Sequence, residues 1–265
     1  MLKSDYIEDD FIKDIISRKT TNYEATVIED SINGTDRLVT LKLRYPRYIH
    51  GELMTHKWLS RNASSSRAIP TEKEIERIKR NPAIPIYWGA NQSGMQAREE
   101  LSKEASDELH DTWLIAMEST IRYVNLLNKR AELISGKKIH KQTVNRLLEP
   151  FQLMETVITA NENKLQEIID LRLHPDAQPE IIRLAYEIFN SVNNSTPVNQ
   201  DYHLPFVTDN EWFNIRRTYD DFDEFIHFIE YVSAGRCARA SYRNFDGSVD
   251  CKKDYELADR LASAV

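Results

Sequence analysis

Cysteine is scarce in this 265-residue sequence, which contains only Cys237 and Cys251. Their spacing matches no metal-binding motif, and neither residue lies in the sequence context of a catalytic cysteine. Two isolated thiols suit a reducing compartment, where disulfides are rare. We therefore expect free thiols, no metal site and a cytoplasmic protein.

Long apolar runs are also missing, although 41% of the residues are apolar. A membrane-spanning helix needs about 20 consecutive apolar residues, and no stretch approaches that length. The charged start MLKSDYIEDDF differs from a signal peptide, which requires an apolar segment. We therefore expect no membrane partner.

Basic residues are fewer than acidic residues, so the formal net charge is −7 and the isoelectric point lies near 5.6. Phosphate backbones attract proteins mainly through positive charge, so this balance argues against a general nucleic-acid binder. A local basic site is still compatible with it. The sequence also has no glycine-rich dinucleotide fingerprint after a strand and no internal repeat, so it predicts neither a Rossmann domain nor a repeat protein.

The patterns that are present predict an α+β fold with an antiparallel sheet and a large helical part. Apolar and β-branched residues at 24–31 and 36–44, separated by Asn33-Gly34-Thr35, predict a β-hairpin. Residues 153–160 are consistent with another strand. Helical patterns cover residues 71–80, 98–130, 140–148, 161–173, 179–193 and 221–232.

We expect one domain over residues 1–265. Its parts are a short helix and tether at 1–22, a helical part at 71–135 and an irregular connection at 194–220. Thr71, followed three residues later by Glu74, has the pattern of a capping box at a helix start. The long helix at 98–130 carries an apolar stripe from Leu101 to Leu127, typical of a face that packs on the core.

Residues 47–70, RYIHGELMTHKWLSRNASSSRAIP, combine basic side chains, a histidine, an asparagine and several hydroxyls. Ile49, Leu53 and Trp58 recur at roughly helical spacing and predict a helix with one buried face. Residues 60–66 predict a loop, because their serine and asparagine side chains compete for backbone hydrogen bonds. Hydroxyls beside an arginine suit a phosphate group, but composition alone is equally consistent with an exposed serine-rich loop.

One motif in this stretch resembles the signature of flavin-dependent thymidylate synthases. The chain has Thr55-His56-Lys57, seven residues, Ser65 and then Arg67, where the family has Arg-His-Arg, seven residues and Ser. Ser60 and Asn62 also fall where the family commonly has these residue types. The chain departs from the family at Thr55, at Lys57 and at Ala63, and it is most similar to the branch found in large bacteriophages.

Three further blocks resemble the same family. They are Asn161 with Arg172 and Ala177-Gln178-x-Glu180, then Val144-Asn145-Arg146 through Pro150, and finally Arg236 through Tyr242. The last block typically lies near the N-terminus, so the element order resembles a circular permutation, which is tolerated where termini lie close together. Residues 253–264 resemble the helix that precedes a flavin-holding segment. Because the chain stops at Val265, we expect a truncated product, a companion C-terminal fragment or an adapted site.

The resemblance implies FAD-dependent methylation of dUMP to dTMP, with methylenetetrahydrofolate as carbon donor and NADPH as reductant. It implies that Arg172 is catalytic, although an arginine at a helix end can also simply satisfy the last carbonyl groups. The implied substrate-binding residues are Glu52, Ser65, Ser66, Arg67 and Arg146. The implied cofactor-binding residues are His56, Lys57, Asn62, Asn161 and Ser241. Lysine at position 57 keeps the positive charge of arginine but loses its bidentate fork.

Other interpretations follow from the same residues. The family implies a homotetramer with sites shared among subunits, in the cytoplasm of a bacterial host if the chain is encoded by a phage. A related enzyme would transfer a hydroxymethyl group to dUMP. The departures at Thr55, Lys57 and Ala63, with the missing segment, instead favour a non-catalytic nucleotide-binding or assembly subunit. A helical interaction protein with chance matches is the remaining alternative.

Overall fold

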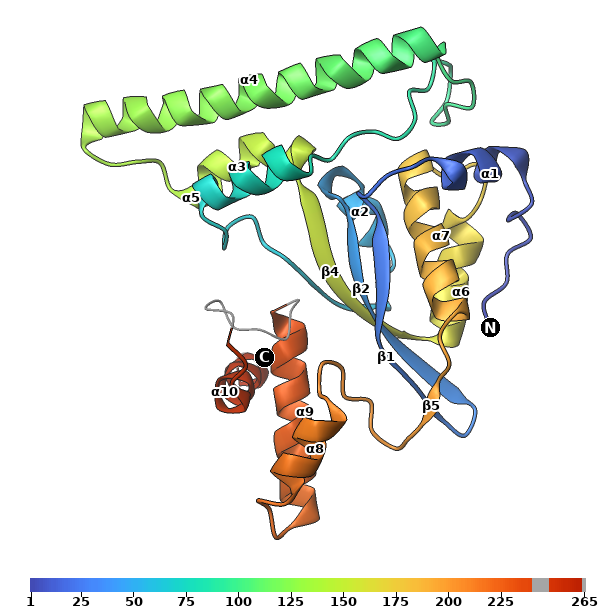
Figure 1. Ribbon diagram of the computed structural model, residues 1–265, viewed down its shortest axis with the longest axis vertical. Coiled ribbons are helices and arrows are strands. Elements are labelled where there is room, and N and C mark those ends of the chain that lie inside the picture. Colours follow the sequence, from blue (N-terminus) through green and yellow to red (C-terminus); the bar gives the residue numbers. More distant parts are fainter. Residues whose placement is uncertain (240–247, 264–265) are drawn as a thin grey trace.

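The computed structural model describes residues 1–239 and 248–263 and has an α+β architecture (Figure 1). Its sheet has the strand order β3-β4-β2-β1-β5, in which only β1 and β5 are parallel. The strands are β1 (Glu24–Asn33), β2 (Asp36–Pro46), β3 (Ser60–Ala63), β4 (Leu153–Asn161) and β5 (Val198–Asn199). The predicted fold class is therefore confirmed.

The central hairpin forms as the sequence predicts. Asn33 pairs with Asp36, and Gly34 between them has φ of 61°, a conformation that only glycine adopts at little cost. Alternate residues of β2 point to one face of the sheet and are fully buried there: Val39, Leu41, Leu43 and Tyr45. This alternation places the main core on one side of the hairpin.

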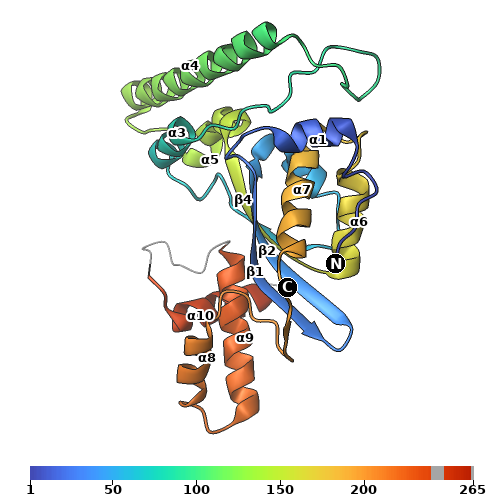
Figure 2. The same cartoon turned by 45° about the vertical axis from the view of Figure 1, so that its right-hand side comes forward.

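The helices form three groups around the sheet (Figures 1 and 2). Helices α6 and α7 cover one face, and α1 packs on α7. Helices α3, α4 and α5 lie at one end, with α4 as a long arm, and α8, α9 and α10 lie on the side away from α6 and α7. The main helices are α1 (Asp10–Ser17), α3 (Thr71–Arg80), α4 (Lys103–Ser135), α6 (Glu162–Arg172), α7 (Pro179–Asn193), α8 (Asp209–Arg216), α9 (Phe222–Ala238) and α10 (Cys251–Ala262). Short helical segments are η1 (Arg47–Ile49), α2 (His50–Leu53), α5 (Lys141–Val144) and η2 (Asn145–Phe151).

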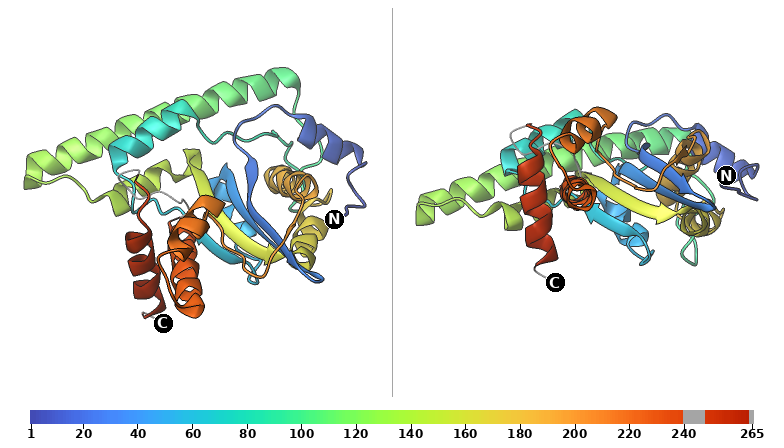
Figure 3. Two further views of the ribbon diagram at one scale, coloured as in Figure 1. Left: turned by 60° about the horizontal axis from the view of Figure 1, so that its bottom comes forward. Right: turned by 90° about the horizontal axis from the view of Figure 1, so that it is seen from below.

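Each group of helices has its own buried cluster. The main cluster joins the sheet to α1, α2, α6 and α7, and a second joins α3 and α4 to η2. The third includes Phe225, Ile229 and Val232 of α9, which pack against residues of α8 and α10. Figure 3 shows α9 and α10 lying side by side. A fully buried ion pair between Arg236 and Asp254 joins the two helices.

Two predictions for residues 47–66 are corrected. The helix is short and broken, because η1 and α2 end at Leu53; Ile49 and Leu53 are buried as predicted, but Trp58 is exposed. The predicted loop at 60–66 contains β3, in which Ser60 pairs with Thr159 of β4. Edge pairing satisfies the backbone of this polar segment, which has no strand pattern of its own.

The start of α3 also differs from the prediction. Pro70 occupies the cap position without a side-chain hydrogen bond, and Thr71 is the first helical residue. Because Thr71 lies inside the helix, Thr71 and Glu74 do not form the predicted capping box; both side chains are buried. Helix α4 begins at Lys103, after the Ser102 cap, and only part of its predicted stripe is buried. Leu101 and Leu127 are exposed.

The segments expected to be irregular are more ordered than predicted. In the 1–22 segment, Ile12 and Ile15 of α1 are fully buried, so this part packs on the core and is no free tether. The 194–220 segment contains β5 and α8, and α8 begins with a capping box between Thr208 and Glu211. The remaining expectation, one domain over 1–265, stays a prediction.

Candidate active site

The end of helix α6 carries the first group of predicted site residues. Arg172 is the last residue of α6, and its Nε donates a hydrogen bond to Nε2 of His56 (3.1 Å). A terminal guanidinium nitrogen donates to Oγ1 of Thr55 (2.8 Å). Longer contacts of 3.5 and 3.4 Å join Arg172 to the carboxylate and the backbone oxygen of Glu52. The fold thus brings together three predicted residues, Glu52, His56 and Arg172, that come from distant parts of the sequence.

His56 is buried, with 1% of its surface exposed. Because Nε2 accepts from Arg172, a neutral ring carries its proton on Nδ1. This Nδ1 is buried and has no partner among the described residues. Burial lowers the pKa of His56, and the positive charge of Arg172 lowers it further. The Nδ1 of His56 is therefore a buried donor without a partner among the described residues, a state that calls for an explanation.

Two carboxyl groups lie close to this arginine and histidine pair. Burial raises the pKa of Glu52, while the charge of Arg172 counteracts the rise. Glu180, in the first turn of α7, accepts hydrogen bonds from the side chain of Gln178 (2.9 Å) and the backbone of Ile86 (3.3 Å). Burial raises the pKa of Glu180 as well, and Glu52 adds to that effect. The predicted Gln178-x-Glu180 block therefore places a second buried carboxyl group within electrostatic reach of Glu52.

The second group of predicted residues surrounds the carboxylate of Glu149. Its Oε1 accepts hydrogen bonds from Arg146 (2.7 Å) and from the hydroxyl of Ser66 (3.4 Å), and it forms an ion pair with Arg47 (3.1 Å). Ser66 is buried, whereas Arg146 is mostly exposed. Two predicted substrate-binding residues, Ser66 and Arg146, thus share one partner.

The loop that carries Ser65, Ser66 and Arg67 is held by side chains from the α5–η2 segment. The buried amide of Asn145 donates to the backbone oxygens of Ser66 (2.8 Å) and Ile69 (3.0 Å). Ser65 accepts from the backbone nitrogen of Arg67 (3.2 Å). Arg67 is exposed. The serine-rich segment is therefore a fixed loop that presents a cation at the surface.

The other predicted cofactor residues lie apart from both groups. The amide nitrogen of Asn62 donates to the backbone oxygens of Cys237 (3.2 Å) and Ala238 (2.6 Å) at the end of α9. Asn161 caps the start of α6 by accepting from Lys164 (3.0 Å), and the helix places it about 16 Å from Arg172. Lys57 is exposed, and Ser241 lies outside the described residues.

Sequence reasoning missed four residues that shape these groups: Arg47, Thr55, Asn145 and Glu149. Thr55 was interpreted only as a departure from the family signature, yet its hydroxyl binds Arg172. Asn145 and Glu149 belong to the 144–150 block that resembles the family, in which the resemblance implies a role for Arg146 alone. The available signal in the sequence was that Asn145 and Glu149 are polar residues in a recognisable block. Their contacts with the serine-rich loop are visible only in the folded structure.

Among the residues that the structure describes, no group of three or more histidine, cysteine or acidic side chains is arranged to hold a metal ion. No helix in the described ranges combines the length and apolar character needed to cross a membrane.

The family model for thymidylate synthase complementing proteins matches residues 36–198, which is more than half of the chain. The protein belongs to this family, and the resemblance to flavin-dependent thymidylate synthases is confirmed. The match includes both groups of site residues but not residues 236–242, so the permuted order stays a prediction. The similarity to the phage branch also stays a prediction.

A search of curated proteins finds no match. Among solved structures, one similar chain is a UMP/dUMP methylase, PolB, from Streptomyces cacaoi bound with 5-Br dUMP. It is 17% identical, with a TM-score of 0.46, and the alignment covers 59% of this chain. The alignment covers 66% of that chain, so this protein spans just under two thirds of its length.

Proposed function

We propose that this protein methylates dUMP at C5 to form dTMP, using methylenetetrahydrofolate as carbon donor, NADPH as reductant and FAD as cofactor. The observation that carries the proposal is the fixed guanidinium of Arg172, held by His56 and Thr55 within a chain of this family. When C5 of uracil acts as a carbon nucleophile, negative charge develops on the N3–O4 side of the ring. An arginine oriented in advance stabilises that charge as it forms.

The second group supports binding of the substrate phosphate. Arg47 and Arg146 contact one carboxylate, Glu149, and the exposed Arg67 lies on the neighbouring loop. A phosphate can replace Glu149 as their partner, with Ser66 donating to its oxygens. Arg47 and Glu52 lie five residues apart on the consecutive segments η1 and α2, a rise of about 8–10 Å. This spacing is comparable with that between the base and the phosphate of one nucleotide.

The residues near Arg172 fit a flavin in part. The unpaired Nδ1 of His56 is a buried donor, and Lys57 is an exposed cation next to it in sequence, so these two residues would contact FAD or its phosphates. Asn161 would reach the same cofactor only at its far end or from another subunit, as in the expected homotetramer. Bound FAD would carry reducing equivalents from NADPH to the transferred carbon.

The first experiment compares Arg172→Ala with Arg122→Ala, which removes an exposed arginine of α4. With FAD, NADPH and methylenetetrahydrofolate, we expect Arg172→Ala to lower dTMP formation about 100- to 1000-fold without loss of the fold. The control should behave as the unmodified protein. Near-normal turnover by Arg172→Ala contradicts the proposed role.

The same assay separates the alternative functions. The mass of the product nucleotide distinguishes a methyl from a hydroxymethyl group. A non-catalytic subunit would bind dUMP and show no NADPH oxidation, and failure to bind any uridine nucleotide would favour an interaction protein. Retention of the visible flavin spectrum after excess FAD is removed tests whether the flavin site assembles in this chain.

A further inference from the structure

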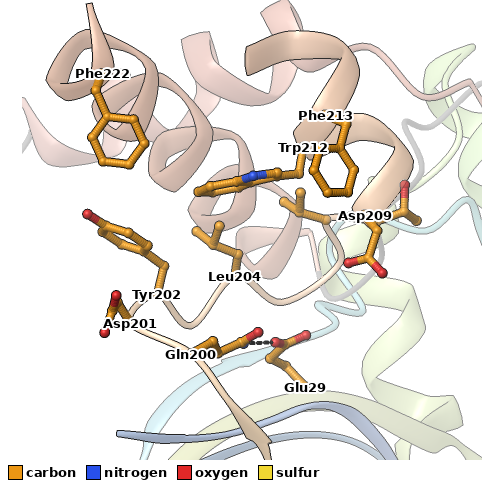
Figure 4. Close-up of a pocket in the computed structure, with 11 residues that line it drawn as sticks. Glu29, Gln200, Asp201, Tyr202, Leu204, Asp209, Trp212, Phe213 and Phe222 are labelled. Carbon is orange, nitrogen blue, oxygen red and sulfur yellow. Dashed lines mark hydrogen bonds between the residues drawn. The ribbon is translucent and has the colours of Figure 1, made fainter. Parts of the chain in front are cut away.

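A cavity of about 570 Å³ lies between strand β1, the connection after β5 and helices α8 and α9 (Figure 4). Its volume falls in the range of small-molecule pockets. Four aromatic side chains line it: Tyr202, Trp212, Phe213 and Phe222. None of the residues discussed for the candidate active site lines this cavity.

The charged side chains that line the cavity are acidic. Glu29, Asp201 and Asp209 contribute carboxyl groups, and no lysine, arginine or histidine is among the lining residues. One cation lies next to the lining, because the guanidinium of Arg216 is 5.4 Å from the centroid of the Phe222 ring. Figure 4 shows Glu29 on the sheet side, opposite Trp212, with its carboxylate bound by Gln200. A register shift in β1 between Val27 and Glu29 marks a bulge, a feature that redirects side chains.

This charge excludes several ligands. The carboxylates repel phosphate and carboxylate groups, so dUMP, FAD and folates do not fit the cavity. Burial raises the pKa of Glu29, and the carboxylate of Asp209 contributes to the rise. A bound positive charge would relieve both effects, because it stabilises the ionised carboxylate.

The geometry of the aromatic rings further limits the ligands that this cavity can bind. The centroids of Tyr202 and Trp212 lie 6.0 Å apart with an angle of 36° between the rings. A flat base inserted between them would need about 3.5 Å on each side, so intercalation of a nucleobase is excluded. The faces of these rings that border the cavity can instead contact a cation, which is attracted to the negative face of an aromatic ring.

We propose that this cavity binds a small organic cation with an alkylated ammonium head, independently of the proposed methylation. The head lies against Trp212 and Tyr202, and the carboxylates of Glu29 and Asp209 balance its charge. The cavity volume leaves room for a tail beyond the head. The cation would be a ligand additional to those of the proposed function.

Choline and its neutral analogue 3,3-dimethylbutan-1-ol test the proposal, because they have similar shapes and differ in charge. The full chain is labelled with 5-fluorotryptophan, and its ¹⁹F resonances are followed during titration, with Trp212→Phe used to assign the signal of Trp212. We expect choline to move the Trp212 resonance saturably and to bind about tenfold more tightly than the neutral analogue. Equal affinities, or no shift of this resonance with choline, overturn the proposal.

Charge-neutralising variants locate the site without removing its aromatic packing. Glu29→Gln combined with Asp209→Asn should weaken choline binding about tenfold, as measured by calorimetry. Glu230→Gln removes an exposed carboxylate of α9 outside the cavity and should leave the affinity unchanged. An equal loss in both variants would indicate non-specific attraction to an acidic protein and would contradict the assignment. Arg172→Ala should retain choline binding even where dUMP turnover is lost, which separates this site from the proposed function.

Discussion

At the scale of single residues, Thr55 stands where the family signature has an arginine, and its side chain still contributes to the candidate site. Its hydroxyl accepts a hydrogen bond from Arg172 at 2.8 Å, so it helps to orient the guanidinium. Removing one such bond costs about 1 kcal/mol, which corresponds to about fivefold in rate. We expect Thr55→Val to lower kcat for dUMP by about this factor. Thr55→Ser keeps the hydroxyl and should stay near the unmodified rate; equal rates for both variants would contradict this role.

His203 gives a residue-scale prediction for stability. Its Nδ1 bonds to Ser31 (2.7 Å) and its Nε2 to Thr40 (2.7 Å), so it joins the connection after β5 to β1 and β2. Burial lowers its pKa to about 4. The unfolded chain, with an ordinary pKa near 6.5, binds the proton more tightly, so acidification favours unfolding. This contribution is fully present above pH of about 6.5 and is lost as the pH falls towards 4.

Urea denaturation at pH 7 and pH 5 measures this effect. We expect the free energy of unfolding of the unmodified protein to fall by about 1–2 kcal/mol more than that of His203→Gln over this interval. His110→Gln removes a partly exposed histidine of α4 and serves as the control. If all three proteins lose the same free energy, His203 has no part in the acid response.

At the scale of elements, the contact between α9 and α10 depends on Gly235. A Cβ placed there would lie 2.0 Å from the backbone oxygen of Asp254, so the two helices would have to separate. That movement would also strain the buried pair of Arg236 and Asp254. We expect Gly235→Ala to reduce the free energy of unfolding by about 2–3 kcal/mol in urea denaturation.

Gly51 provides the matched control. It lies in α2, and a Cβ there would meet no atom within 4 Å. Alanine favours helix over glycine by about 1 kcal/mol, so Gly51→Ala should be neutral or slightly stabilising. Equal destabilisation by both substitutions would show that the close approach of α9 and α10 is not the cause.

At the scale of the whole molecule, the sequence predicted the elements that carry their own pattern. The hairpin and α7 were predicted because their apolar periodicity is local, whereas β4 has a less regular pattern that was only consistent with a strand. Strand β3 was missed because it is polar and depends on pairing with β4. Helix α8 was missed although Thr208 and Glu211 form a capping box that is visible in the sequence.

The same distinction applies to the candidate site. The family motif named Glu52, His56 and Arg172, and the fold brings them together. The motif gave no sign that Asn62 would bind the end of α9 or that Glu149 would join two arginines, because both contacts require segments distant in sequence to approach. A motif therefore allowed the site residues to be predicted, but it did not predict which residues they would contact.

The three separate cores lead to a prediction about cooperativity. The α8–α10 group has a small buried cluster, and its links to the sheet include Asn62 at the end of α9 and His203. Few buried apolar contacts favour local opening. In native-state hydrogen exchange, we expect amides of α9 to open at lower free energy than those of β2 and β4. Equal protection would instead support one cooperative domain.

Asn62 tests whether this link sets the opening of α9. Its amide donates to two carbonyl groups at the helix end, so Asn62→Ala should lower the opening free energy of α9 by about 1 kcal/mol. Because β2 packs in the main core, its exchange should not change. Asn91→Ala, in an exposed part of the 81–102 segment, is the control. If Asn62→Ala accelerates exchange equally in β2 and α9, the α8–α10 group and the sheet open as one unit. The hydrogen bonds of Asn62 would then belong to a core shared by the sheet and the α8–α10 group.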